Sequence, residues 1–237
     1  MIISKFMKKA LIFILAFVLL SFVQVGYNKN KKLGELLIKK EELPKKLGIV
    51  IDSTSLSKTS EMLDEDKFWL IIDNSLKKSS NQEEQEKILV EEIEQLSPKE
   101  MIGFRLRTDK LLYDTYNSEI WCAGYIMNGG CSDDGFEYFR CWLISRGKNT
   151  YYKTKSNPDY LVNEANESIE FYDFESFWYV ALTAFKTKTG KELYDYIDYD
   201  KFKTNEGNYP KFKFTWEENN PESMKKICPQ LFQKFIK

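Results

Sequence analysis

Helix start signals recur throughout residues 62–237. In Ser97-Pro98-Lys99-Glu100 a serine stands before a proline, and a glutamate follows three residues after the serine. A serine in this place caps a helix, a proline suits the first helical position, and the glutamate completes a capping box. The pairs Asn157-Pro158 and Asn220-Pro221 repeat the cap-then-proline start. A chain punctuated in this way favours helices over strands.

Apolar residues recur at helical spacing behind these signals. Trp69, Ile72 and Leu76 follow the acidic residues 64–66, and a second apolar stripe follows Asn81, a predicted N-cap with Glu84 in the capping-box position. The other predicted stripe residues are Leu89, Ile93, Leu96, Ile102, Leu106, Asp109, Leu112 and Tyr116. Residues 173–189 predict a further helix that ends at Gly190. Alternating strand patterns are scarce, so the sequence predicts an all-α, single multi-helix domain at residues 62–237.

The first 26 residues have the pattern of a signal peptide or a membrane anchor. Lys5, Lys8 and Lys9 precede an apolar run at residues 10–20, which is short for a membrane span. We expect the protein to be exported to the periplasm after cleavage, or anchored through this segment if it is not cleaved; a cytoplasmic location is disfavoured. Residues 27–61 are interpreted as a spacer with a possible short strand at residues 47–51.

Composition excludes several classes of function. The chain contains no histidine, which rules out Ser-His-Asp and Cys-His catalysis and histidine-ligated metals. The formal net charge is −1, with no basic stripe in residues 62–237, so no nucleic-acid partner is predicted. Cys122, Cys131, Cys141 and Cys228 lack zinc-site spacing and are expected as free thiols or, among the first three, one disulfide. No cofactor and no metal ligand set is predicted.

Residues 127–142, MNGGCSDDGFEYFRCW, predict a corner between two helices. Gly129 suits the end of the first helix, because glycine readily adopts a positive φ. Capping-box spacing to Glu137 favours Asp134 as the N-cap of the second helix. Ser132 and Asp133 are then not needed for capping, and Asp133 shares a helical stripe with Glu137 and Arg140, where an ion pair can hold it.

Aromatic and polar residues converge on this corner from both predicted helices. They have the composition of a pocket for a peptide or small ligand, although aromatic packing between two helices is the favoured interpretation. The candidate binding residues are Trp121, Tyr125, Asn128, Ser132, Asp133, Asp134, Glu137, Tyr138, Arg140 and Trp142.

The leading hypothesis for function is a binding or interaction module, of an immunity type or a regulatory type, with a protein or a small polar ligand as partner. A membrane contact is expected only through the N-terminal segment, if that segment is not cleaved. The alternative is a carboxylate-dependent, metal-assisted hydrolase that uses Asp133, Asp134 and Glu137. The acidic run at residues 83–94 is interpreted mainly as a solvated helix face, with docking of a basic partner as the lesser alternative.

Several segments together resemble a known family. They are DEDKFWLIIDNSL, LLYDTYNSEIWCAGYIMNGGCSDDGFEYFRCWLISRGK, FWYVALTAFKTKTGKELYD and CPQLFQKF. With these segments the chain resembles the bacterial domain-of-unknown-function family number 4240 over roughly residues 62–235. The resemblance implies a mainly helical bacterial domain and carries over no established activity and no catalytic residue.

Overall fold

The computed structural model describes residues 56–166 and 169–236. The predicted leader and the short strand predicted at residues 47–51 lie outside these ranges. Within them, no helix is both long enough and apolar enough to cross a membrane.

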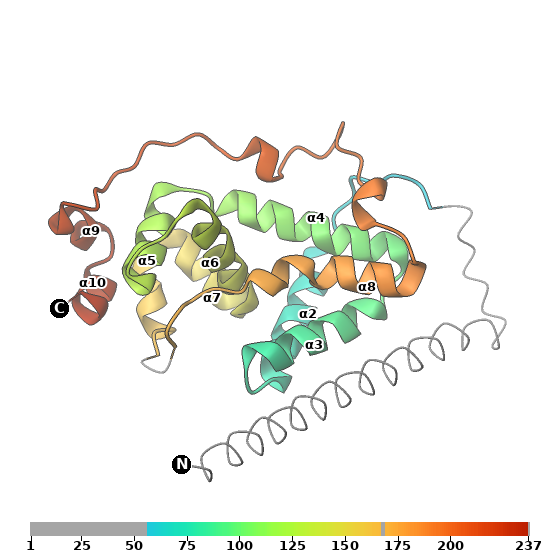
Figure 1. Cartoon of the computed structure of the whole chain (residues 1–237), viewed down its shortest axis with the longest axis horizontal. Helices are drawn as coiled ribbons and strands as arrows, with labels where there is room; N and C mark the ends of the chain where they lie inside the picture. Colours follow the sequence, from blue (N-terminus) through green and yellow to red (C-terminus); the bar gives the residue numbers. More distant parts are fainter. Residues whose placement is uncertain (1–55, 167–168, 237) are drawn as a thin grey trace, which may run out of the picture. The chain divides into compact units, whose positions relative to one another are not determined.

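The described residues form an all-α domain (Figure 1), which confirms the predicted fold class. The α-helices are α2 (Glu65–Lys78), α3 (Gln82–Glu94), α4 (Pro98–Asp114), α5 (Ser118–Asn128), α6 (Asp133–Ser145), α7 (Gly147–Ser156), α8 (Val180–Thr189), α9 (Pro221–Ile227) and α10 (Pro229–Phe235). Short 3-10 helices are η2 (Pro158–Asn163), η3 (Glu175–Tyr179), η4 (Leu193–Tyr196) and η5 (Glu206–Asn208). In this part of the chain β-pairing is limited to isolated bridges.

The predicted caps largely hold. Both hydrogen bonds of the capping box at Ser97 and Glu100 are present at the start of α4. The Asn81 side chain accepts a hydrogen bond from the Glu84 backbone N–H, but the Glu84 carboxylate reaches back to Ser80 N rather than to Asn81 N. The side chain of Asn220 makes no capping bond, so only the proline of that predicted start is used.

Helix α4 is the centre of the core. Every residue from Met101 to Leu106 is buried, and α8, α6 and α2 pack around the helix. Gly103 makes one of these approaches possible, because a Cβ at that position would lie 2.7 Å from the backbone nitrogen of Leu63. The Leu63 N–H instead donates a hydrogen bond of 2.9 Å to the Gly103 carbonyl. A helix buried on all sides is typical of the centre of a multi-helix domain.

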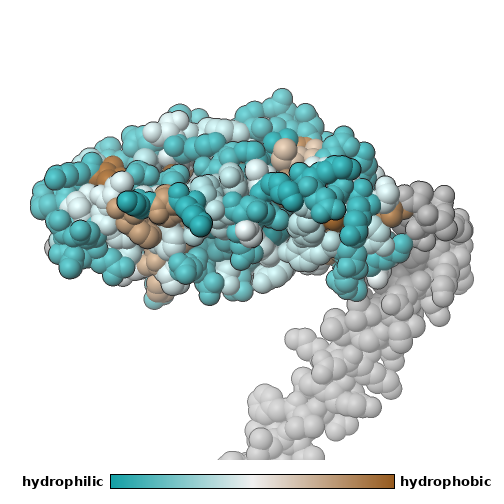
Figure 2. Space-filling model, turned by 90° about the horizontal axis from the view of Figure 1, so that it is seen from above, coloured by the Kyte–Doolittle hydropathy of each residue, from teal (hydrophilic) through white to brown (hydrophobic). Residues whose placement is uncertain are grey.

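A strap, residues 203–216, which includes η5, runs from the η4 region to α9 and passes along α4 and α5 (Figure 1). Trp216 anchors it: the residue is buried, and its Nε1 donates a 2.9 Å hydrogen bond to the Ser118 carbonyl. Tyr209 stacks on Tyr116 with the ring centroids 4.3 Å apart. Figure 2 looks down on this side of the domain and shows brown hydrophobic patches within a mostly hydrophilic surface.

Candidate functional site

The corner between α5 and α6 differs from the prediction in its N-cap. Gly129, with φ 65°, ends α5 as predicted. The cap of α6, however, is Ser132, whose Oγ accepts a hydrogen bond of 3.1 Å from Gly135 N. The prediction that Asp134 is the N-cap is therefore wrong. Asp133 and Asp134 occupy the first turn of α6, where the positive end of the helix dipole favours acidic side chains.

The predicted ion pair of Asp133 is also wrong. Arg140 pairs with Glu137, at 2.8 Å between Nη2 and Oε2, and its side chain is only 1% exposed. Asp133 is exposed and forms no hydrogen bond or ion pair with the described residues. The reason is that α6 directs Arg140 into the core, whereas the first-turn acids point into solvent.

Five of the ten candidate residues line one open groove with a volume of about 850 Å³. They are Trp121, Asp133, Asp134, Glu137 and Tyr138. The lining residues that were not among the candidate binding residues are Tyr116, Trp178, Tyr179, Glu206, Gly207, Tyr209, Pro210, Lys211, Phe212 and Phe214. The helices α5 and α6, the turn before α5, the 3-10 helix η3 and the strap thus each contribute to the walls.

Three other candidates make contacts elsewhere in the domain. Tyr125 packs on Trp216, with ring centroids 5.0 Å apart. The Asn128 amide holds the backbone of Tyr172 on both sides, accepting from its N–H at 2.8 Å and donating to its carbonyl at 3.3 Å. Trp142 is buried with its ring edge-on to Tyr172. Tyr125 thus ties α5 to the strap, whereas Asn128 and Trp142 tie α5 and α6 to the segment before η3.

The groove wall next to the corner is made of stacked aromatic rings. Trp121 lies flat on Phe136, with centroids 4.3 Å apart, and its Nε1 donates to the Cys131 carbonyl at 2.9 Å. From the strap, Phe214 meets Trp121 edge-on at 5.2 Å. The favoured prediction, aromatic packing between two helices, holds for Trp121, but one edge of this packing also borders the groove.

Arg140 lies buried next to this wall. Its guanidinium lies 5.0 Å from the Tyr116 ring centroid and 4.8 Å from that of Tyr209. Its Nη1 donates a 2.6 Å hydrogen bond to the Leu112 carbonyl at the end of α4. Burial raises the pKa of Glu137, and the Arg140 charge opposes this rise. The pair therefore holds a carboxylate at the groove and connects α4, α6 and the strap.

A second buried pair positions the far end of the groove. Arg105 Nη2 lies 2.6 Å from Asp109 Oδ1, and its Nη1 donates to the Trp178 carbonyl at 2.8 Å. The guanidinium also lies 3.6 Å from the centroid of the Trp178 ring. Burial raises the pKa of Asp109 to about 6, against the lowering effect of Arg105. Asp109 belongs to the predicted buried stripe of α4, and Arg105 is what makes its burial possible.

The negative charge of the groove is largely unpaired. Asp133, Asp134 and Glu206 form no hydrogen bond or ion pair through their side chains with the described residues, and one lysine, Lys211, lines the groove with them. Over residues 56–166 and 169–236 no group of three or more Cys, Asp or Glu side chains is arranged to hold a metal ion. The carboxylates are therefore spread along the groove rather than gathered at one point.

All four cysteines are free thiols, which settles the alternative of a disulfide. Cys122, Cys141 and Cys228 are buried, and Cys131 in the corner is half-buried. Burial raises the pKa of both Cys131 and Cys141 to about 12. A thiol with such a pKa is almost entirely protonated at neutral pH and is a poor nucleophile.

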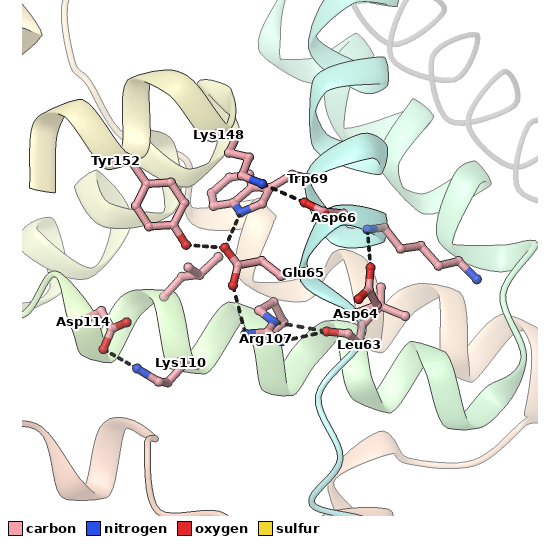
Figure 3. A network of polar contacts seen from close by, with 12 residues as sticks. Leu63, Asp64, Glu65, Asp66, Trp69, Arg107, Lys110, Asp114, Lys148 and Tyr152 are labelled. Atoms are coloured by element: carbon pink, nitrogen blue, oxygen red, sulfur yellow. Dashed lines mark hydrogen bonds and ion pairs between the residues drawn. The ribbon is translucent and has the colours of Figure 1, made fainter.

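A separate polar network joins the starts of α2 and α7 to α4 (Figure 3). The Glu65 carboxylate accepts hydrogen bonds from the Tyr152 hydroxyl and from Trp69 Nε1, the latter at 3.2 Å, and lies 3.5 Å from Arg107 Nη1. The Tyr152 hydrogen bond is the largest cause of the lowered pKa of Glu65. Each of these groups is paired within the network, so its role is to hold three helices together.

Comparison with protein families identifies the chain at the level of its domain. The family model described as "Protein of unknown function (DUF4240)" matches residues 63–187. The match covers more than half of the 237 residues, so the chain belongs to this family. Comparison with curated proteins and with solved structures gives no significant match. The matched region contains the α5, α6 and η3 walls of the groove, whereas the strap lies beyond it.

Proposed function

We propose that the domain is a binding module whose groove accepts a positively charged segment of a partner protein. The observation that carries the proposal is the set of unpaired carboxylates, Asp133, Asp134 and Glu206, along a groove of about 850 Å³. Negative charges without counter-charges along a concave surface attract cationic groups and raise the rate at which they bind.

The aromatic walls favour the same partner. The faces of tyrosine and tryptophan rings attract ammonium and guanidinium groups, with about 0.5–1 kcal/mol per contact at exposed sites. Lysine and arginine also carry apolar stems that can pack along such rings while the charged head reaches a carboxylate. Tyr116, Trp121 and Tyr179 line the groove together with Asp133 and Asp134. A module of this kind suits an immunity-type or regulatory role, in which the domain occupies a surface of its partner.

The geometry supports this role better than the alternative of a metal-assisted hydrolase. Glu137 is bound to Arg140 rather than free to act as a base or a ligand. Among the described residues, Asp133, Asp134 and Glu137 do not form a cluster that could hold a metal ion.

The cellular location is part of the proposal and rests on the sequence of the first 26 residues. Lys5, Lys8 and Lys9 before an apolar run support export, which would place the groove outside the cytoplasm. Intact mass measurement of the protein from its native host tests this. Loss of the leader supports export with cleavage, a full-length chain in the membrane fraction supports an anchor, and a full-length chain in the cytosol contradicts both.

A peptide-binding experiment tests the groove. The full-length protein is titrated by calorimetry with a peptide of alternating lysine and glycine, and with its counterpart in which glutamate replaces lysine. We expect the lysine peptide to bind and the glutamate peptide not to bind. The affinity should fall as salt is added, because exposed charges are screened over about 8–10 Å near physiological ionic strength.

Two matched double variants distinguish an effect of the groove on binding from an effect of the protein's net charge. The double variant Asp133→Asn/Asp134→Asn should weaken binding by about tenfold or more, which is about 1.4 kcal/mol. The control Glu83→Gln/Glu91→Gln removes the same charge from exposed positions of α3 and should leave the affinity unchanged. Equal losses in both double variants, or no binding of the lysine peptide by the wild type, would refute the proposal. A loss confined to the α3 variant would assign the site to the acidic run at residues 83–94.

A further inference from the structure

A second cavity, of about 390 Å³, lies between the start of α3 and the end of α6. It is separate from the groove and shares no lining residue with it. Ser80 and Gln82 line it from the start of α3, Trp142 and Arg146 from α6 and its C-cap, and Phe171 from the segment before η3. A volume of this size lies within the usual range for small-molecule sites, about 300–1,000 Å³.

Arg146, which lines this cavity, differs from the other arginines of the chain in its pairing. The other three arginines, Arg105, Arg107 and Arg140, each form an ion pair with a carboxylate. Arg146 forms no ion pair with the described residues, although it is largely buried and burial lowers its pKa. Burying a cation without a counter-ion costs free energy. An anion bound in the cavity would remove that cost.

The guanidinium of Arg146 is held in place by neutral groups. Nη2 donates to Gln85 Oε1 at 2.6 Å and to Ser145 Oγ at 3.1 Å, and Nε donates to Ser145 Oγ at 3.2 Å. Nη1 donates no hydrogen bond to the described residues. Glu164 acts on Arg146 only through its charge, and its Oε1 accepts from Thr150 Oγ1 at 2.8 Å. The guanidinium of Arg146 is thus oriented before a ligand binds, and its Nη1 can still donate to that ligand.

The start of α3 reinforces the positive character of the cavity. Asn81 caps Glu84 N, and the Glu84 carboxylate accepts from Ser80 N at 2.7 Å. The backbone N–H groups of Gln82 and Glu83 make no hydrogen bond to the described residues. Free N–H groups at a helix start, together with the helix dipole, favour an anion. The negative charge of Glu84 partly opposes this effect.

The opposite side of the cavity is apolar. Trp142 is 3% exposed, and Phe171 is 57% exposed although its side chain is large and hydrophobic. An exposed phenylalanine at the mouth of a cavity provides a surface on which an apolar part of a ligand can pack.

We propose that this cavity binds a small organic anion, with a carboxylate or phosphate oxyanion at Arg146 and an apolar body against Trp142 and Phe171. An arginine bound to an oxyanion forms short, charge-assisted hydrogen bonds, which are stronger than those between neutral groups. The proposal does not depend on the function proposed for the groove, since the two sites share no residue.

Thermal unfolding of the full-length protein with model anions tests the proposal. The probes are benzoate, phenyl phosphate, acetate and inorganic phosphate, each compared with sodium chloride at the same ionic strength. A ligand that binds only the folded state raises the melting temperature as its concentration increases. We expect both aromatic anions to do so more strongly than acetate and inorganic phosphate. The tighter of the two aromatic anions identifies the preferred headgroup.

Two variants and one control locate the effect. Arg146→Lys keeps the charge but loses the planar fork, so the affinity for both aromatic anions should fall about tenfold or more. Phe171→Ala changes an exposed side chain and should weaken benzoate binding while leaving the response to inorganic phosphate unchanged. Lys77→Gln removes an exposed positive charge near the cavity and should change neither response.

Two results would overturn the proposal. One is the absence of stabilisation of the wild type by either aromatic anion beyond that of chloride. The other is stabilisation of equal size in the wild type and in Arg146→Lys.

Discussion

Replacing Arg140 by methionine is the most informative perturbation of the contacts that support the groove. The change removes the partner of Glu137 and the 2.6 Å hydrogen bond to the Leu112 carbonyl. Removing one partner of a buried ion pair costs about 3–5 kcal/mol, because a charge is left buried and unpaired. The Glu137 side chain retains 16% of its exposure, so we expect the lower end, about 3 kcal/mol.

The second half of this test is a double-mutant cycle. Glu137→Gln keeps the shape and an acceptor oxygen, and should cost about 1–2 kcal/mol. If the two side chains act as a pair, the double variant should be more stable than the sum of the single losses predicts, by about 1–2 kcal/mol. Urea unfolding followed by far-UV circular dichroism measures each free energy of unfolding. Strictly additive losses would refute the coupling.

The pH dependence supplies an independent check. Burial raises the pKa of Glu137, so its contribution to stability is fully present below its unfolded pKa and is lost as the pH rises through the folded pKa. Without Arg140 the pKa should rise further, because the opposing positive charge is gone. The loss caused by Arg140→Met should therefore be smaller at about pH 4.5 than at pH 7. A loss independent of pH would show that Glu137 does not interact with Arg140.

Three further predictions concern the corner, the second buried pair and the thiols. Since Ser132 is the N-cap, Ser132→Ala should lower the free energy of unfolding, measured with urea, by about 0.5–2 kcal/mol, and Asp134→Asn should lower it much less. The reverse order would reject this assignment. Burial raises the pKa of Asp109 from 3.8 to about 6, so the free energy of unfolding of the wild type should fall relative to that of Asp109→Asn as the pH rises between these two values. Parallel pH profiles of the two proteins would contradict this. Cys131, with its pKa raised to about 12, should react slowly with a thiol reagent in the native protein at pH 7; labelling at the rate of an unfolded control would contradict its protonated state.

The contrast between the α4 start and the α6 start shows how far local signals reach. At Ser97 the serine, the proline and the glutamate each stand in their preferred place, and all three indicate the same starting residue for the helix. At the α5–α6 corner Ser132, Asp133 and Asp134 are all good caps, and the spacing to Glu137 favoured the wrong one. Glu137 is held by the buried Arg140 and so does not close a capping box. A contact between side chains inside the core thus decided a local choice.

The groove also shows that local sequence signals do not specify contacts between distant segments. Its α5 and α6 walls come from the stretch that the sequence singled out, but Trp178, Glu206 and Tyr209 come from segments far along the chain. The alternation of Phe212, Phe214 and Trp216 with more polar residues was a usable signal for an extended segment. Nothing in that alternation specifies which helices the segment crosses.

What the sequence determined by itself is the helical class, several helix starts and ends, the absence of histidine chemistry and the family, because these depend on local spacing and residue types. Only the tertiary structure decided which charges are buried and what surrounds them. Arg140 has Glu137 three residues before it on α6, a spacing that permits an ion pair, whereas Arg146 has no acidic residue three or four positions away. Arg140 turns toward Glu137 beneath aromatic rings, while Arg146 faces neutral groups in a cavity. The burial of each arginine and the groups that surround it arise only when distant helices pack together.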